Sequence, residues 1–213
     1  MDNKLKRYNV GIFVFDETEV LDFTGPFEVF SRTRTEEGPE SRKNETSAPF
    51  KVFTVSKSNQ TIKATGGLLI TPSYSFQDVP FIDILIIPGG YGIRTIADDE
   101  NVIAWIKKVN KDTLITASVC TGSLLLAKAG LLYGKKATTH WSALKELSKY
   151  KNICIQEECR VVDDQIITSA GVASGIDASF YIISKFFNER VINDTAKFIE
   201  YNYINNFNNN VSN

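Results

Sequence analysis

One cysteine lies where an α/β protein could carry a nucleophile. Cys120 follows an apolar run, residues 114–119, and precedes Thr121, Gly122 and a helical segment. This order is typical of the sharp strand-to-helix turn that exposes a nucleophile above a sheet. The N-terminus of the following helix is expected to stabilise a thiolate and lower the pKa of the thiol. The alternative is a buried, inert thiol, the commoner state of a free cysteine. The glycine turns around Cys120 favour the reactive thiol.

A second glycine turn follows another apolar run. Residues 82–87 end at Pro88, Gly89 and Gly90, where the absence of side chains permits close backbone approach. Ligands of open α/β sheets gather beyond the carboxyl ends of the strands, so the two turns are predicted to meet there. The backbone N–H groups of Thr121 and Gly90 are then expected to bind negative charge that develops on a substrate.

An acidic residue near the N-terminus is a candidate partner for the thiol. Asp22 lies in an apolar stretch, Val20 to Phe23, where a carboxylate must pair, accept hydrogen bonds or take up a proton. A protonated Asp22 could donate to a thiolate, whereas an ionised one would favour the neutral thiol. The two groups would titrate as a coupled pair. The alternative is a helix cap, and we favour the role in the site.

Two further polar residues, His140 and Asp177, belong to short motifs of their own. His140 is the sole histidine, so a mechanism that needs an imidazole has one candidate. It follows a short strand-like segment near the same edge, but the adjacent Trp141 is equally consistent with a packed residue, and both interpretations remain open. Asp177 is predicted to cap a helix.

Composition excludes several classes of protein. The chain has 213 residues, 24 Lys and Arg, 25 Asp and Glu, and a net charge of −1, without the basic excess of a nucleic-acid binder. No apolar run approaches the roughly 20 residues that cross a membrane, and no signal peptide is recognised. Three cysteines and one histidine favour a reducing, cytoplasmic setting and argue against a disulfide scaffold or a structural zinc site.

The alternation of strand-like and helical segments along the chain predicts a three-layer α/β domain. Its sheet is mostly parallel, with helices on both faces. A single domain is expected over residues 1–204, with a frayed Asn-rich tail at 205–213. Residues 33–49 are predicted to form a surface loop, and Asp98 to cap the helix that follows it. A proline in the first turn suggests that a helix opens at Thr24-Gly25-Pro26. The other predicted elements are strands at 8–15, 50–56, 82–87, 114–119 and 166–169, a hairpin through Gly66-Gly67, and helices at 99–111, 123–129, 176–187 and 192–203.

Five motifs occur in an order that resembles a known superfamily. They are Leu21-Asp22-Phe23-Thr24-Gly25-Pro26, Pro88-Gly89-Gly90, Val119-Cys120-Thr121-Gly122-Ser123, Ala137-Thr138-Thr139-His140-Trp141 and Gly175-Ile176-Asp177. The series is similar to the ThiJ/PfpI superfamily, whose fold is like that of class I glutamine amidotransferases. It is most similar to the isonitrile hydratase branch and to the amidotransferase-like domains of AraC-type regulators. The resemblance implies a flavodoxin-like sandwich and a homodimer.

The resemblance also implies a chemistry. In the isonitrile hydratase branch the functional residues match Cys120, Thr121 and Asp22, whereas protease-like members carry histidine at the position of Thr121. We therefore expect hydration of a small isonitrile to a formamide, without metal or organic cofactor, with Gly89, Gly90 and His140 around the substrate. The alternatives are a ligand or redox sensing module and a glyoxalase-type or deglycase-type activity on small aldehydes. No nucleic acid or membrane partner is expected.

Overall fold

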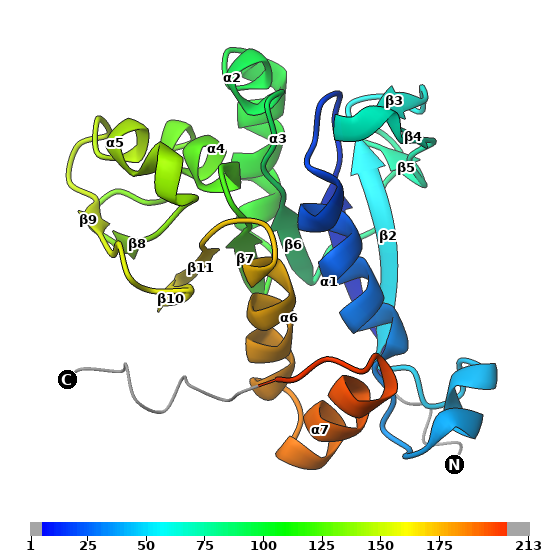
Figure 1. The fold of residues 1–213 in the computed structure, drawn as a ribbon. Helices are drawn as coiled ribbons and strands as arrows, with labels where there is room; N and C mark the ends of the chain where they lie inside the picture. Colours follow the sequence, from blue (N-terminus) through cyan, green and yellow to red (C-terminus); the bar gives the residue numbers. More distant parts are fainter. Residues whose placement is uncertain (1–5, 204–213) are drawn as a thin grey trace.

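The computed structural model describes residues 6–203, and its centre is a seven-stranded sheet (Figure 1). The strand order is β10-β11-β7-β6-β1-β2-β5. All neighbouring pairs are parallel except β10 and β11, which form an antiparallel hairpin. The strands are β1 (Tyr8–Phe13), β2 (Phe50–Ser56), β5 (Tyr74–Ser75), β6 (Ile84–Ile87), β7 (Ile115–Ser118), β10 (Val161–Asp164) and β11 (Ile166–Ser169). The predicted mostly parallel α/β fold is confirmed.

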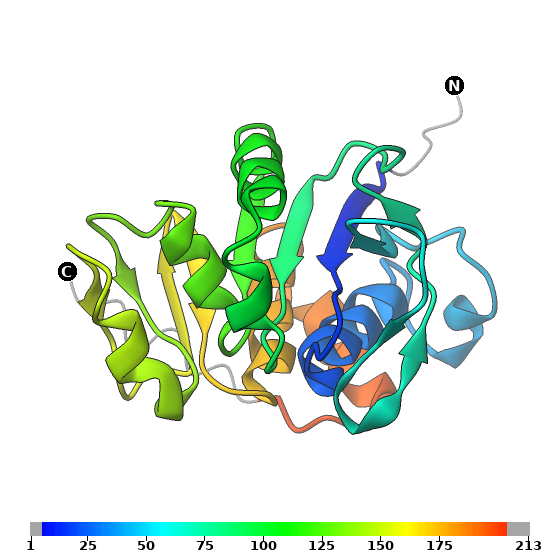
Figure 2. The same cartoon turned by 90° about the horizontal axis from the view of Figure 1, so that it is seen from above.

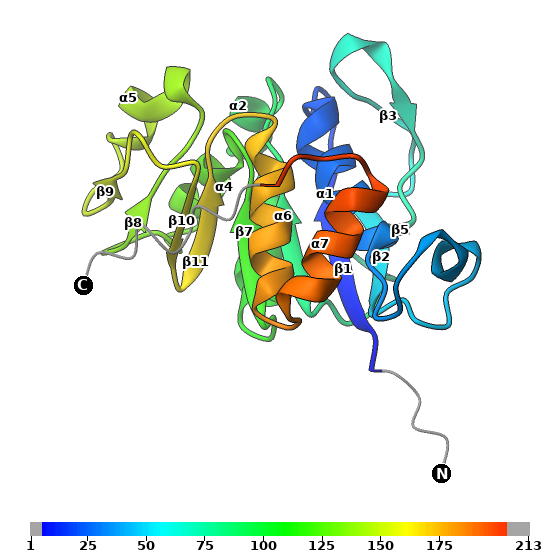
Figure 3. The ribbon, with the colours of Figure 1, turned by 60° about the horizontal axis from the view of Figure 1, so that its bottom comes forward.

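Helices cover both faces of this sheet. Figure 3 shows α1 (Val20–Arg32), α6 (Ser174–Ser184) and α7 (Glu189–Phe198) together on one face, and Figure 2 shows α3 (Glu100–Asn110) and α4 (Gly122–Lys128) on the other. The remaining elements are short. They are helices α2 (Ile93–Ile96) and α5 (Leu144–Leu147), the 3-10 turns η1 (Pro39–Lys43), η2 (Thr65–Gly67) and η3 (Trp141–Ala143), and the two-stranded ribbons β3–β4 (Ile62–Lys63 with Leu69–Ile70) and β8–β9 (Lys136–Ala137 with Cys154–Ile155).

The core consists of two apolar layers, one on each face of the sheet. Alternate residues of a strand point to opposite faces, so Val10 and Ile12 pack under α1, α6 and α7, whereas Phe13 packs on the side of α3 and α4. Each such fully buried aliphatic or aromatic side chain contributes about 1.5–3 kcal/mol through removal from water. The central strands are apolar at nearly every position because both faces are covered.

The first helix begins earlier than the sequence predicts. Helix α1 starts at Val20, so Pro26 lies inside it and Asp22 lies in its first turn. Proline removes one backbone donor and crowds the carbonyl four residues earlier. Burial of Phe23, Val29 and Phe30 on the core side compensates for this cost, because packing of the apolar face dominates helix stability in proteins. The prediction that the helix opens at Thr24-Gly25-Pro26 is therefore wrong.

Two smaller predictions also change. The cap of α3 is Asp99 rather than Asp98, and its carboxylate accepts from the Asn101 N–H at 3.0 Å. Residues 33–49 are not a simple surface loop, because Arg34 and Arg42 are buried within them. Arg34 donates to four backbone carbonyls around it.

Arg42 extends this anchoring to the C-terminal helix, because its guanidinium forms an ion pair with Asp194 of α7.

The predicted 205–213 tail lies outside the described residues. Among residues 6–203, no helix is both long and apolar enough to span a bilayer.

Candidate active site

Cys120 occupies the turn between β7 and α4. Its φ of 55° lies in the left-handed region, and its N–H donates to the carbonyls of Ser169 and Ala170 at 3.2 and 3.0 Å. Gly122 permits the next helix to start against β6, since a Cβ there would lie 2.0 Å from the Ile87 carbonyl oxygen. The residue is only 6% exposed. The local structure thus matches the predicted strand-to-helix turn, with the sulfur deeper than a surface nucleophile.

Asp22 reaches this turn from the first turn of α1 and is fully buried. Its Oδ2 accepts the Gly89 N–H at 2.8 Å, and the Cys120 thiol donates toward the same carboxyl. The other carboxylate oxygen, Oδ1, has no hydrogen-bond partner among the described residues. The predicted juxtaposition of thiol and carboxyl is therefore present in the structure, and one carboxylate oxygen is left with unused acceptor capacity.

Burial shifts both titrating groups toward their neutral forms. Desolvation raises the pKa of Asp22 to about 7, assisted by the charge of Glu19 and opposed by the Gly89 N–H and the thiol. Desolvation and then the charge of Asp22 raise the pKa of Cys120 to about 12. The expectation that the helix N-terminus lowers the pKa of this thiol is wrong, because these two effects outweigh the nearby donors. Near neutral pH the cysteine is a thiol, and the pair titrates at the carboxyl.

The glycine turn between β6 and α2 supports the pair from one side. A Cβ on Gly89 would lie 2.5 Å from Thr121 Oγ1 and 2.9 Å from Asp22 Oδ2. Gly90 has a φ of 130°, and a Cβ there would lie 2.3 Å from the Glu17 carbonyl oxygen. The Gly90 N–H donates to Thr121 Oγ1 at 3.0 Å. This N–H therefore orients the threonine hydroxyl, and is not free to bind a substrate atom as we expected.

The sequence interpretation missed Val172, which lies in the loop between β11 and α6. Its backbone N–H donates toward the Cys120 sulfur, as does the N–H of Thr121, and the Thr121 side chain also acts to lower the pKa of this thiol. Val172 has a φ of 42°, a conformation that is strained for a β-branched residue and costs about 1–3 kcal/mol. The loop is fixed on both sides by hydrogen bonds from the Ala170 N–H to the Arg160 carbonyl and from the Gly175 N–H to the Val172 carbonyl. No sequence signal marks a backbone donor in this loop.

His140 lies at the edge of the candidate site and does not contact the Cys120 thiol through a hydrogen bond. Its Nδ1 accepts the Ser142 N–H at 3.3 Å and lies 2.7 Å from Ser142 Oγ, so the imidazole caps η3. The ring packs against the loop that carries Val172, because a Cβ on Gly171 would lie 2.2 Å from its Cδ2. Within the described residues, no hydrogen bond joins His140 to Cys120 or Asp22. The preceding residue, Thr139, donates to the Cys120 carbonyl at 3.0 Å.

Asp177 lies in the first turn of α6, but not as a backbone cap. Its carboxylate forms an ion pair with Arg160 and accepts from the Tyr201 hydroxyl at 2.8 Å. These contacts tie α6 to the segment before β10 and to the chain after α7. Across residues 6–203, no cluster of three or more His, Cys, Asp or Glu side chains is arranged to hold a metal ion.

Comparison with known proteins places this geometry in a family. Residues 8–185 match the model of the DJ-1/PfpI family. The isonitrile hydratase of Pseudomonas putida is 32% identical over 193 residues, which cover 90% of this chain and 75% of that protein. The transcriptional regulator GbdR of Pseudomonas aeruginosa is 28% identical over 137 residues, or 64% of this chain and 37% of the regulator.

A solved structure agrees over nearly the whole chain. The crystal structure of a ThiJ/PfpI family protein from Pseudomonas syringae is 29% identical, with a TM-score of 0.81, and the match covers 96% of this chain and 79% of that one. The fold of this chain thus has a counterpart in a known structure. The chain belongs to the DJ-1/PfpI family.

Proposed function

We propose that this protein hydrates small isonitriles to N-substituted formamides through a thioimidate on Cys120. The observation that carries the proposal is the contact between the Cys120 thiol and the buried Asp22 carboxyl, whose pKa is raised to about 7. Similarity to isonitrile hydratase over 90% of the chain supports the choice of substrate class. Above about pH 7 the pair supplies a thiol and a carboxylate, which are a latent nucleophile and the base that activates it.

The first step forms the thioimidate. As the sulfur of Cys120 bonds to the terminal isonitrile carbon, the thiol proton passes to the Asp22 carboxylate. Asp22 then gives this proton to the same carbon, which produces S–CH=N–R and restores the carboxylate. The N–H groups of Thr121 and Val172 donate toward the sulfur and stabilise the negative charge that develops on it during proton transfer.

The second step consumes water. The Asp22 carboxylate accepts a proton from a water molecule as its oxygen adds to the thioimidate carbon, and the nitrogen takes up that proton. The carbon–sulfur bond breaks, the departing sulfur recovers the hydroxyl proton, and the products are the formamide and the Cys120 thiol. The same backbone donors stabilise the sulfur as it leaves.

Two variants test the assignment of roles. Cys120→Ala and Asp22→Asn should each abolish formamide production from a small isonitrile such as cyclohexyl isocyanide, while Cys154→Ser, at an exposed thiol, should retain it. Mass spectrometry of the wild-type protein quenched during turnover should find the added substrate mass on Cys120. Normal turnover by either site variant excludes this mechanism.

The similarity to the regulator GbdR favours a second candidate, a ligand-sensing module without turnover. The chain spans 37% of the length of that regulator. Saturable binding of a small molecule with no product, unchanged in Cys120→Ala, would support sensing over hydration. Cysteine-dependent conversion of methylglyoxal to lactate would instead support the glyoxalase alternative.

A further inference from the structure

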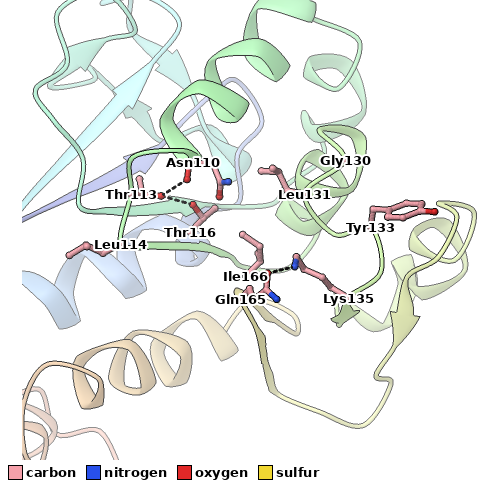
Figure 4. Close-up of a pocket in the computed structure, with 10 residues that line it drawn as sticks. All are labelled: Asn110, Thr113, Leu114, Thr116, Gly130, Leu131, Tyr133, Lys135, Gln165 and Ile166. Atoms are coloured by element: carbon pink, nitrogen blue, oxygen red, sulfur yellow. Dashed lines mark hydrogen bonds between the residues drawn. The ribbon is translucent and has the colours of Figure 1, made fainter.

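A second concave site lies at the edge of the sheet where β7 and β11 begin (Figure 4). It is an open concavity with a volume of about 440 Å³, within the range of small-molecule sites. Thr116 of β7 lines it, and Cys120 follows four residues later, so about 13 Å of extended chain separates the two sites. The lining comes from residues 110–116, 130–135 and 165–166. This site is therefore distinct from the candidate active site.

The wall after α4 is held in place by hydrogen bonds. Gly130 has a φ of 76° and closes the helix, with its N–H on the Ala127 carbonyl at 2.9 Å. Gly134 donates to the Asn152 carbonyl at 2.6 Å, and the Asn152 amide donates to the Tyr133 hydroxyl at 2.6 Å. A ligand would therefore meet a preformed wall, which lowers the entropic cost of binding.

One positive charge faces this site without a counter-ion. Lys135 Nζ donates to Gln165 Oε1 at 2.6 Å, and Figure 4 shows these two side chains meeting at one side of the site. No acidic side chain is among the lining residues, and no ion pair to Lys135 forms within the described part of the chain. The neighbouring Asp164 instead accepts the Lys136 N–H at 2.8 Å. The site therefore favours an anion.

The rest of the lining is largely apolar or internally satisfied. Leu114 and Tyr133 are 57% and 66% exposed, and Figure 4 shows them at opposite ends of the site, with Leu131 between them. The hydroxyls of Thr113 and Thr116 pair with each other at 3.0 Å. A matching ligand thus presents an apolar body and a single charged head.

We propose that this site binds a small monocarboxylate with an aliphatic or aromatic body. The carboxylate accepts from Lys135 Nζ, and the body lies against Leu131 and the ring of Tyr133. A single cationic side chain matches a single negative charge, whereas a phosphate dianion would require a second cationic side chain. The neutral Gln165 amide orients the ammonium without cancelling its charge.

Calorimetry with octanoate and the neutral octanamide tests this proposal on the full chain. Octanoate should bind, and octanamide should bind about tenfold more weakly or not at all. Lys135→Met keeps the aliphatic stem and should remove this preference, whereas Lys136→Met, next in the chain and outside the lining, should not. Cys120→Ala should bind octanoate as the wild type does, so the result is independent of the proposed hydratase function.

Three outcomes would overturn the assignment. The first is no octanoate binding up to about 10 mM, where even weak specific binding is measurable. The second is equal affinity for octanoate and octanamide, or affinity unchanged by Lys135→Met. The third is loss of binding in Cys120→Ala, which would place octanoate in the candidate active site.

Discussion

Removal of the Asp22 charge should make Cys120 more reactive toward a small thiol reagent while it abolishes turnover. Asp22→Asn preserves the shape of the side chain and an oxygen that can accept the Gly89 N–H. It removes the negative charge that, after burial, contributes most to the raised pKa of the thiol. Two unit charges about 4 Å apart interact by about 4 kcal/mol at an effective dielectric constant near 20, equivalent to about three pKa units as an upper limit.

The expected gain in rate is smaller than the gain in thiolate. A fall of about two to three units from a pKa of about 12 increases the thiolate fraction at pH 8 by about 100- to 1,000-fold. A less basic thiolate is also less nucleophilic, with a Brønsted coefficient of about 0.4–0.5. The net acceleration should therefore be about 10- to 50-fold.

The assay follows thiol exchange with methyl methanethiosulfonate at pH 8, in a Cys154→Ser, Cys159→Ser background where Cys120 alone can react. Mass spectrometry measures the fraction of modified protein over time. Glu19→Gln is the matched control. The charge of Glu19 acts on Asp22 but is not among the causes of the raised pKa of the thiol. The rate of thiol exchange at Cys120 should therefore change far less in this variant. If Cys120 in the Asp22→Asn variant reacts with the reagent no faster than Cys120 in the wild type, the electrostatic coupling inferred from the structure is refuted.

Four other outcomes are expected. Formamide production should rise with pH through an apparent pKa near 7 that belongs to the pair, because the carboxylate form is the base; a descending limb near pH 7 would contradict this role. Above pH 7, Asp22→Asn should raise the free energy of unfolding by up to about 4 kcal/mol. The native carboxyl titrates near 7 instead of 3.8, so its ionisation opposes folding as pH rises between these values. Urea unfolding should therefore show no such gain below pH 4. Thr121→Val should lower kcat by about tenfold or more, while Thr121→Ser retains it, because the hydroxyl accepts the Gly90 N–H; equal rates would remove the hydroxyl from the mechanism. Gly171→Ala should displace the His140 ring, since its Cβ would lie 2.2 Å from Cδ2, and an unchanged imidazole NMR signal would show that the loop gives way instead.

Much of the fold could be predicted because the relevant signals are local. The apolar runs at residues 82–87 and 114–119 identified β6 and β7, and the glycine turns marked where these strands end. The start of α1 could not be predicted, because the preference for proline in a first turn is a local rule. Tertiary packing of Phe23 and Phe30 overrides it.

The sequence alone determined which chemical groups are present and which turn carries the thiol. The Cys120-Thr121-Gly122 order, and the similarity of five motifs to one superfamily, needed no coordinates. The tertiary structure decided which groups meet. It brought Asp22 against a thiol 98 residues away, and it aimed the N–H of Val172 at the sulfur.

The structure also decided the direction of the pKa shift of Cys120. The local sequence indicated a helix N-terminus, whose partial charge favours a thiolate. Burial and the charge of Asp22 reverse that preference. Desolvation depends on everything packed around an atom, most of which is distant in the sequence, so no local pattern of residues encodes its magnitude.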